Sequence, residues 1–377
     1  GLGDDVPLLV WLQERIWPYE SNMTEADSEA STLLLGIEQI RNGVTCIGES
    51  GGQHVPGMVR AMEQLGLRGV LSRSTMDTGE GLPEPWQSTT DRELALQTAL
   101  YEQHNGAAEG RVRIWYSLRT IFNNSDELIT RTAQLAKQHQ TGIMMHVAEI
   151  REENEFAIAT RGTSTVTHLY NLGVLAPNLL AAHCVWMTED EIAMFRDHDV
   201  KVTHNPAAAM KVLGFAKIPE MLDEGITVSI GTDGAPCNNR MSLVDEMWLT
   251  SLIHKGRTLD PTVMDAQSVL AMGTILGAKS LLWDDEIGSL EVGKKADLIV
   301  VNPDTANMLP LHDPVANLIS AMKTDNIEST MVDGRWLMRD REILVVDEAE
   351  VIERAKRHAA EIAERGGINL PDRFPVL

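Results

Sequence analysis

"VSIGTDGAPCNN", residues 228–239, is an apolar run that stops at Gly231 and Thr232 and then presents an aspartate, Asp233. A short apolar run is typical of a strand buried on both faces of a parallel sheet. A carboxylate at the end of such a strand lies on a rigid rim, where it can bind a cation or accept a proton. The alternative is that Asp233 only caps the next turn. The residues that end the neighbouring strands bear on this choice.

Six further apolar runs precede this one, with room for a helix between successive runs. The seven predicted strands cover residues 43–50, 67–75, 111–119, 141–149, 179–186, 200–207 and 226–234. Amphipathic stretches at 125–140 and 188–199, opened by the N-cap residues Ser125 and Thr188, predict helices. No G-x-G-x-x-G lies at a strand-to-helix junction, so the alternation favours a closed α/β barrel over an open dinucleotide-binding sheet.

A (β/α)₈ TIM barrel requires eight strands, and the sequence shows seven. Residues 1–42 carry leucine and isoleucine at helical spacing, which predicts helices there. We therefore expect the first barrel strand to be missing from the N-terminal side of the sequence. Residues 265–283 predict an outer helix, so the barrel is expected to occupy residues 1–285.

The last part of the chain has a different character. Residues 287–302 and 329–346 are rich in β-forming residues, and Asp333-Gly334 predicts a hairpin turn. A helix at 348–367 ends at a pair of glycines. We expect residues 286–377 to form the C-terminal part of a small β-sandwich plus a closing helix, with the N-terminal strands of that sandwich also missing.

The overall charge excludes several classes of partner. The chain has 32 basic and 55 acidic residues, a net charge of −23, which opposes binding to nucleic acid or to anionic lipid. The sequence has no run of about 18 apolar residues that could span a membrane. The three cysteines are widely spaced and make no disulfide framework. A cytoplasmic protein with a small-molecule partner is expected.

Polar residues end four successive predicted strands: His146, His183, His204 and Asp233. The carboxyl ends of barrel strands line the mouth of the barrel, where active sites lie. A single histidine is more often a satisfied core residue. Three imidazoles and a carboxylate at neighbouring strand ends instead predict a shared metal or acid–base site.

Glu149 follows His146 by three positions in "HVAE". Strand alternation places positions i and i+3 on opposite faces, so Glu149 must leave the strand and turn over the mouth. Apolar neighbours, among them Met144, Met145 and Trp186, would raise its pKa enough for it to donate a proton to a ring nitrogen. The alternative is that Glu149 is one of several solvated charges at a helix start.

Other candidates are less specific. The predicted strand 111–119 ends in Arg119, which is a candidate substrate contact or a surface ion-pair group. Glu49, at the end of the first predicted strand, is equally ambiguous. His54 and His168 are interpreted as structural.

Five segments together resemble the amidohydrolase superfamily, in the branch of the S-adenosylhomocysteine/methylthioadenosine deaminases and triazine hydrolases (ATZ/TRZ). They are "HVAE", "AAHCVW", "THNP", "IGTDGAPCNN" and "IGSLEVGKKADLIVVN", in the order of the family, within residues 43–345. The resemblance implies a TIM barrel with a small β-sandwich built from both chain ends. It also implies one divalent metal, usually zinc and sometimes iron, with a His-x-His pair on the first strand.

The resemblance also implies roles for individual residues. His146 and Asp233 look like metal ligands, His183 like the group that positions the attacking hydroxide, and Glu149 like the acid that protonates the ring. The predicted strand that ends in Arg119 has no lysine to bridge a second metal, which argues for a single ion. Two further residues are candidate substrate contacts beside Arg119, namely Trp186 and His204.

The expected activity is hydrolytic deamination of a cyclic amidine, with release of ammonia. The substrate would be an adenosine derivative such as S-adenosylhomocysteine or methylthioadenosine, or a purine or pterin base. After "HNP" the chain reads "AAAMKVLGF", where many adenosine-type deaminases have Ser-Asn, so a triazine-type hydrolase that releases chloride or an alkylamine is an alternative.

The sequence has no His-x-His. A metal-free scaffold relative is therefore a further alternative, but the retained polar mouth favours an enzyme whose first strand is missing. The resemblance also implies a homo-oligomer, a dimer or a multiple of dimers.

Overall fold

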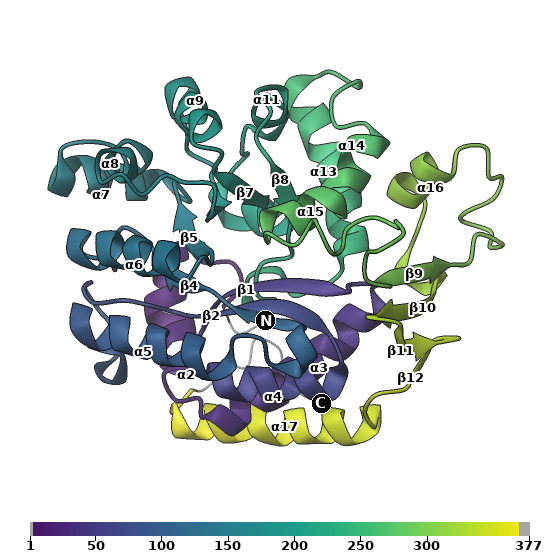
Figure 1. The fold of residues 1–377 in the computed structure, drawn as a ribbon, viewed down its shortest axis with the longest axis horizontal. Helices are drawn as coiled ribbons and strands as arrows, with labels where there is room; N and C mark the ends of the chain where they lie inside the picture. The colour runs from purple at the N-terminus through teal and green to yellow at the C-terminus, as the bar shows by residue number, and fades with distance from the viewer. Residues whose placement is uncertain (1–2, 369–377) are drawn as a thin grey trace, which may run out of the picture.

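The computed structural model describes residues 3–368. A curved wall of parallel strands is surrounded by helices, and a small antiparallel sheet lies beside it (Figure 1). All seven predicted strands are present, the third of them in two pieces. Their bounds are β1 Cys46–Gly52, β2 Arg68–Arg73, β3 Val112–Ile114, β4 Tyr116–Leu118, β5 Ile143–Val147, β6 Leu179–His183, β7 Lys201–His204 and β8 Val228–Ile230.

The predicted strand 111–119 divides at Trp115. Before this residue, β3 pairs in parallel with β2, and after it, β4 pairs in parallel with β5. The Trp115 N–H donates to the carbonyl of Leu71 in β2, whereas the next N–H, of Tyr116, donates to Gly142 before β5. The chain therefore passes from the sheet β1-β2-β3 to the sheet β4-β5-β6-β7-β8, and β1 and β8 are the outer strands of the wall.

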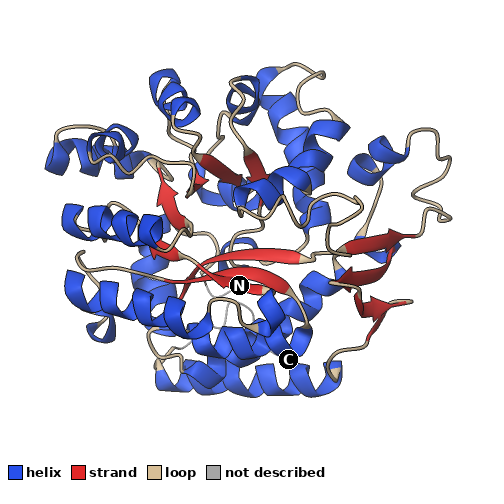
Figure 2. Ribbon diagram, viewed as in Figure 1, coloured by secondary structure: helices blue, strands red, loops and turns tan. Residues whose placement is uncertain are grey.

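Helices follow the strands and cover the outside of the wall (Figure 2). They are α4 Val55–Leu65, α5 Thr90–His104, α6 Asp126–Gln138, α7 Arg151–Arg161, α8 Thr165–Asn171, α9 Glu189–Asp197, α11 Ile218–Asp223 and α13 Leu243–Thr258. Both predicted N-caps are confirmed, because Ser125 accepts a hydrogen bond from the N–H of Leu128 and Thr188 forms a capping box with Glu191.

The N-terminal region is helical, as predicted. It comprises α1 Leu8–Trp11, a π-helical turn η1 Leu12–Ile16, α2 Trp17–Glu20 and α3 Glu25–Arg41. The helix predicted over 265–283 is instead two helices, α14 Ala266–Met272 and α15 Ile275–Ser280. Thr274 interrupts it with φ −131° and ψ −98°, after Gly273, where a Cβ would lie 2.8 Å from the sulfur of Met247.

The second predicted unit contains one antiparallel sheet in the described residues. Its strands are β9 Leu298–Val301, β10 Ile327–Val332, β11 Arg335–Arg339 and β12 Glu342–Ile343, and neighbouring strands pair antiparallel in the order β12-β11-β10-β9. The predicted hairpin turn is confirmed, since Asp333 and Gly334 both have positive φ between β10 and β11. A short helix, α16 Pro314–Ser320, lies between β9 and β10, and the predicted closing helix is α17 Glu348–Arg365.

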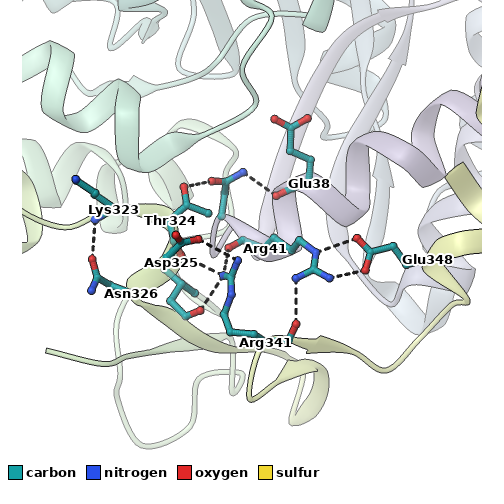
Figure 3. A network of polar contacts seen from close by, with 10 residues as sticks. Glu38, Arg41, Lys323, Thr324, Asp325, Asn326, Arg341 and Glu348 are labelled. Carbon is teal, nitrogen blue, oxygen red and sulfur yellow. Dashed lines mark hydrogen bonds and ion pairs between the residues drawn. The ribbon is translucent and has the colours of Figure 1, made fainter. Parts of the chain in front are cut away.

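Buried and half-buried ion pairs join the small sheet to the barrel. Figure 3 shows Arg41, from the last turn of α3, between the carboxylate of Glu348 and the carbonyl of Arg341. In the barrel, Arg68 of β2 binds Asp297, beside β9, at 2.6 Å, and both side chains are 2% exposed. The two units therefore have fixed contacts through α3 and β2. No helix among residues 3–368 is both long and apolar enough to cross a membrane.

Candidate active site

A cavity of about 770 Å³ is lined by the carboxyl ends of the barrel strands, by β1 along its length, and by residues of the small sheet such as Ile299 and Ile327. The outer strands β1 and β8 both line it, and they do not pair with each other. Five of the residues predicted from sequence line this cavity, namely Arg119, His146, Glu149, His183 and Asp233. The cavity therefore brings together groups that follow β4, β5, β6 and β8.

His146 is held in the state of a neutral imidazole with one free nitrogen. Its Nδ1 lies 2.9 Å from the carbonyl oxygen of Arg119. A carbonyl only accepts, so Nδ1 carries the hydrogen and Nε2 keeps its lone pair. Burial, with the positive charge of Arg119, holds the pKa of His146 well below its ordinary value. This is the arrangement in which a histidine ligates a metal, because a carbonyl fixes the other ring nitrogen.

His183 has the opposite arrangement. The amide nitrogen of Asn205 donates to His183 Nδ1 at 3.3 Å, so Nε2 carries the hydrogen. That Nε2 lies 3.6 Å from Glu149 Oε1 and 4.0 Å from Asp233 Oδ2. The rings of His146 and His183 are stacked, with centroids 5.5 Å apart. The geometry suits a hydrogen-bond donor between two carboxyl groups rather than a second metal ligand.

Glu149 lies in a turn that leaves β5 at once. Ala148 has φ 50°, a left-handed conformation, and the turn brings Glu149 to the cavity. Burial raises the pKa of Glu149, and the negative charge of Asp233 adds to this effect. The direction of the shift agrees with the expectation from sequence. Its apolar surroundings differ from the expectation, because of the three named neighbours only Met144 lines the cavity.

Asp233 follows β8 in a left-handed conformation, with φ 60°. Its Oδ1 accepts from the N–H of Gly234 at 2.6 Å, whereas Oδ2 faces His183. The local turn contact and the cavity contact therefore use different oxygens. Cys237, in the short helix α12 Ala235–Asn238 that follows, also lines the cavity, and burial with the neighbouring charge of Asp233 raises the pKa of its thiol well above the ordinary value.

Backbone strain gathers at these strand ends. Ala148, His183, Cys184 and Asp233 all have φ between 50° and 72°. Non-glycine residues rarely adopt this conformation, and the surrounding structure must hold them in it. Strained turns after three strands of one sheet edge are what a preorganised site requires.

Two acidic residues that the sequence left unassigned or ambiguous also line the cavity. Burial raises the pKa of Glu20 to about 7, and the charge of Glu49 adds to this effect while Arg119 opposes it. Burial likewise raises the pKa of Glu49. Glu20 lies on the helix α2, so the rule that active-site residues follow barrel strands does not identify it from the sequence. Arg119 donates to Ser74 Oγ at 3.4 Å and remains at the cavity wall.

Two predicted substrate contacts are not supported. His204 does not line the cavity, and its Nε2 lies 3.1 Å from His254 Nε2 on α13, because strand alternation turns the neighbouring Thr203 and Asn205 inwards instead. Trp186 is also absent from the cavity wall and is 42% exposed. Its indole N–H donates to the carbonyl of Leu213 at 2.9 Å.

Trp186 therefore contacts the cavity wall only through Leu213. It holds the π-helical turn η4 Ala209–Leu213, whose residues Val212 and Leu213 do line the cavity. This turn lies within the segment "AAAMKVLGF", residues 207–215. The predicted role of Trp186 as a substrate contact differs from its position, because its indole N–H binds the carbonyl of Leu213 and its ring does not line the cavity.

The residues of the cavity fit part of a metal-binding shell. Nε2 of His146 and the carboxylate of Asp233 are suitable ligand atoms, whereas catalytic zinc has three protein ligands. Within residues 3–368, the one group of three His, Cys, Asp or Glu ligand atoms within 4.8 Å of one another is Asp27, His358 and Glu361, outside the cavity wall. The donor types and tautomers agree with a cation site, for which His146 and Asp233 would supply two of the protein ligands.

Comparison with known proteins agrees with the motifs. The profile of the amidohydrolase family matches residues 1–337. The 5'-deoxyadenosine deaminase of Methanobrevibacter smithii is 35% identical over 366 residues, which are 97% of this chain and 82% of that protein. A 5-methylthioadenosine/S-adenosylhomocysteine deaminase of Syntrophomonas wolfei is 36% identical over 371 residues, 96% of this chain and 82% of the relative.

The fold has close counterparts as well. The crystal structure of an adenosine deaminase from Xanthomonas campestris with bound zinc matches with a TM-score of 0.91 at 27% identity, over 97% of this chain and 82% of that one. This similarity and the family match confirm the predicted TIM-barrel fold. The chain belongs to the amidohydrolase family.

Proposed function

We propose that the protein is a hydrolytic deaminase that replaces the exocyclic amine of an adenosine derivative by oxygen and releases ammonia. The observation that carries this proposal is the convergence of four groups on one cavity, with opposite tautomers in its two imidazoles. The names of the deaminases at 35% and 36% identity support an adenosine derivative as the substrate.

Three side chains of the cavity have separate roles in the proton transfers of the reaction. Asp233 accepts a proton from the attacking water, and His183 donates an Nε2–H hydrogen bond to the attacking oxygen. Glu149, whose pKa is raised by burial, donates a proton to the ring nitrogen beside the amine-bearing carbon. The C–N bond then breaks as Asp233 gives its proton to the leaving amine. The remaining hydroxyl proton restores Glu149, and the keto product and ammonia leave.

A divalent cation, zinc in the first instance, would be held by His146 and Asp233 together with ligands beyond these two, and it would supply Lewis-acid activation of the attacking water. The carbonyl of Arg119 keeps Nε2 of His146 available for this role. The Nε2–H of His183 leaves that residue free to act on oxygen.

The rest of the cavity favours a nucleoside over a free base. Glu20, Glu49 and Arg119 provide hydrogen-bonding groups at the wall, and carboxyl oxygens accept from sugar hydroxyls. Val212 and Leu213 add an apolar wall, which suits a small apolar substituent at the 5' position.

Ammonia release tests this proposal directly. The zinc-loaded protein is assayed with 5'-deoxyadenosine, 5'-methylthioadenosine, S-adenosylhomocysteine, adenosine, guanine, a pterin and a chlorinated triazine. We expect the highest kcat/KM for the first two substrates. The Glu149→Gln variant removes the proton donor, and Glu152→Gln, at an exposed neighbouring position, is its matched control.

The other functions have distinct outcomes in the same assay. Chloride or alkylamine release without ammonia release would move the protein to the triazine hydrolases. No turnover of any substrate, with less than about 0.1 equivalent of bound metal after loading, would indicate a scaffold protein, because a hydrolytic site of this kind depends on its cation.

A further inference from the structure

The turn that carries Glu149 is bound by a second glutamate. Glu153, fully buried in the first turn of α7, accepts the N–H of Ala148 through Oε1 at 2.9 Å and the N–H of Glu149 through Oε2 at 2.8 Å. The groups that act on Glu153 are these two backbone N–H groups, the charge of Glu149 and the side chain of Thr165, with no cation among them. Each carboxylate oxygen accepts from a backbone N–H of the strained turn after β5, in addition to the contact with Thr165.

The helix that follows β6, α9, has a glutamate at the same helix position with different partners. Glu191 is also the third residue of its helix, α9, and is 3% exposed. Its Oε2 accepts the N–H of the cap residue Thr188 at 2.7 Å, and its Oε1 binds the hydroxyl of Ser164. This is a capping box, and neither partner lines the cavity.

Glu153 departs from that pattern in its partners. Its helix has Ile150 as N-cap, with no side-chain cap, and the carboxylate reaches past this residue to the two N–H groups before it. One of the two belongs to Ala148, whose φ of 50° directs the chain out of β5, and the other to Glu149 itself. The contact therefore fixes the turn at the point where Glu149 receives its direction.

We propose that Glu153 is a positioning residue for catalysis, which sets the orientation of Glu149 through its two backbone hydrogen bonds. The inference rests on the proposed role of Glu149 as proton donor. Proton transfer requires the acid within hydrogen-bonding reach of the ring nitrogen, and a displacement of about 1 Å at such a group lowers rates by about 100-fold. A carboxylate is needed because it is the side chain with two accepting oxygens at this spacing.

Kinetics of matched variants test the proposal. Glu153→Gln keeps the shape but turns one acceptor into a donor, so one N–H of the turn loses its partner. We expect kcat to fall about 10- to 100-fold with KM within about threefold of the parent protein. Glu191→Gln makes the same change in the capping box of α9, and its kcat is expected to stay within about twofold.

A double variant separates positioning from general stability. If Glu153 acts through Glu149, then Glu153→Gln has less than about a twofold effect on kcat in a Glu149→Gln background. A loss of equal size in both backgrounds, or equal kcat values for Glu153→Gln and Glu191→Gln, would overturn the proposal.

Hydrogen exchange provides a readout that does not require turnover. The amides of Ala148 and Glu149 are expected to exchange at least about tenfold faster in Glu153→Gln than in the parent protein, while those of residues 188–191 do not change. Unchanged exchange at 148–149 would also overturn the proposal. Absence of deaminase activity in the parent protein, with faster exchange in the variant, would instead remove the proposed function and leave the contact in place.

Discussion

Buried carboxylates at two places in this molecule have opposite surroundings. Where α3 meets the closing helix α17, the side chain of Asp27 is 1% exposed and accepts from Thr24, His358 and Arg365. Burial acts to raise its pKa, but the donors outweigh burial and hold the pKa below its ordinary value. At the cavity, burial raises the pKa of Glu149, and the nearby charge of Asp233 adds to the shift.

The difference separates structural from functional acids. The carboxylate of Asp27 is saturated with donors and joins two helices that Figure 1 shows side by side, so its charge is stabilised by the fold. Glu20, Glu49 and Glu149 face a cavity, and burial raises the pKa of each. Acids with raised pKa values in a cavity are the groups that a reaction uses, whereas paired acids stabilise the native state. Exchanging each kind of acid for its amide tests this division.

The largest effect is expected at the cavity. Glu149→Gln and Asp233→Asn each remove a proton-transfer group, so kcat should fall by about 10³-fold or more. The melting temperature should change by less than about 4 °C, because neither carboxylate has a cationic partner whose charge is left buried. Steady-state ammonia release and thermal unfolding measure the two quantities. A near-normal kcat for either variant would exclude that residue from the chemistry.

At the contact between α3 and α17, which we call the junction, the expected effect is on stability and not on kcat. Asp27→Asn leaves Arg365 and His358 without their carboxylate, and the free energy of unfolding should fall by about 2 kcal/mol, less than for a fully buried pair because Arg365 is 37% exposed. The kcat of the folded fraction should be unchanged. Urea unfolding with activity measured below the transition tests both parts, and Glu364→Gln, at an exposed position on α17, is the control. A large loss of kcat in a stable Asp27→Asn protein would contradict the division.

The strand ends could be read from the sequence because a barrel obeys simple rules. Apolar runs give the strands, and their last polar residues give the rim, so His146, His183 and Asp233 were placed at one cavity. The same rule does not place His204, because the position of a strand end does not determine which face of the sheet a side chain occupies. In β7 the register turns Asn205 inwards and sends His204 to His254 of α13, and only pairing with β8 determines this.

The supporting residues were beyond sequence reasoning for a different reason. Glu20 lies on a helix that reaches the cavity through the tertiary fold, and Glu153 looks like any acidic residue at a helix start until the turn after β5 is known. Trp186 was placed near the mouth, yet its partner is a carbonyl in a π-helical turn with no sequence signature. Contacts between loops depend on conformations that neither periodicity nor spacing encodes.

A smaller effect is expected from pH at the junction. The pKa of Asp27 in the folded state lies below its ordinary value of 3.8. Its contribution is therefore complete above the unfolded pKa and is lost as pH falls through the folded pKa. The difference in unfolding free energy between the parent protein and Asp27→Asn should be constant above about pH 5 and shrink below about pH 4. Urea titrations at pH 3, 4, 5 and 7 measure it, and a difference that grows on acidification would reverse the assignment.

The smallest effect is expected for Trp186, whose N–H already has a hydrogen-bond partner, as the carboxylate of Asp27 does. Trp186→Phe removes the N–H that binds the carbonyl of Leu213, a bond worth about 1 kcal/mol at most at a partly exposed site. Because η4 forms part of the cavity wall and carries no proton-transfer group, KM should rise about threefold to fivefold while kcat stays constant. If kcat instead fell about tenfold at constant KM, the indole would act on the reacting substrate, as the sequence first suggested. In that case a residue's distance from the cavity would predict its effect on kcat better than whether its polar group already has a hydrogen-bond partner.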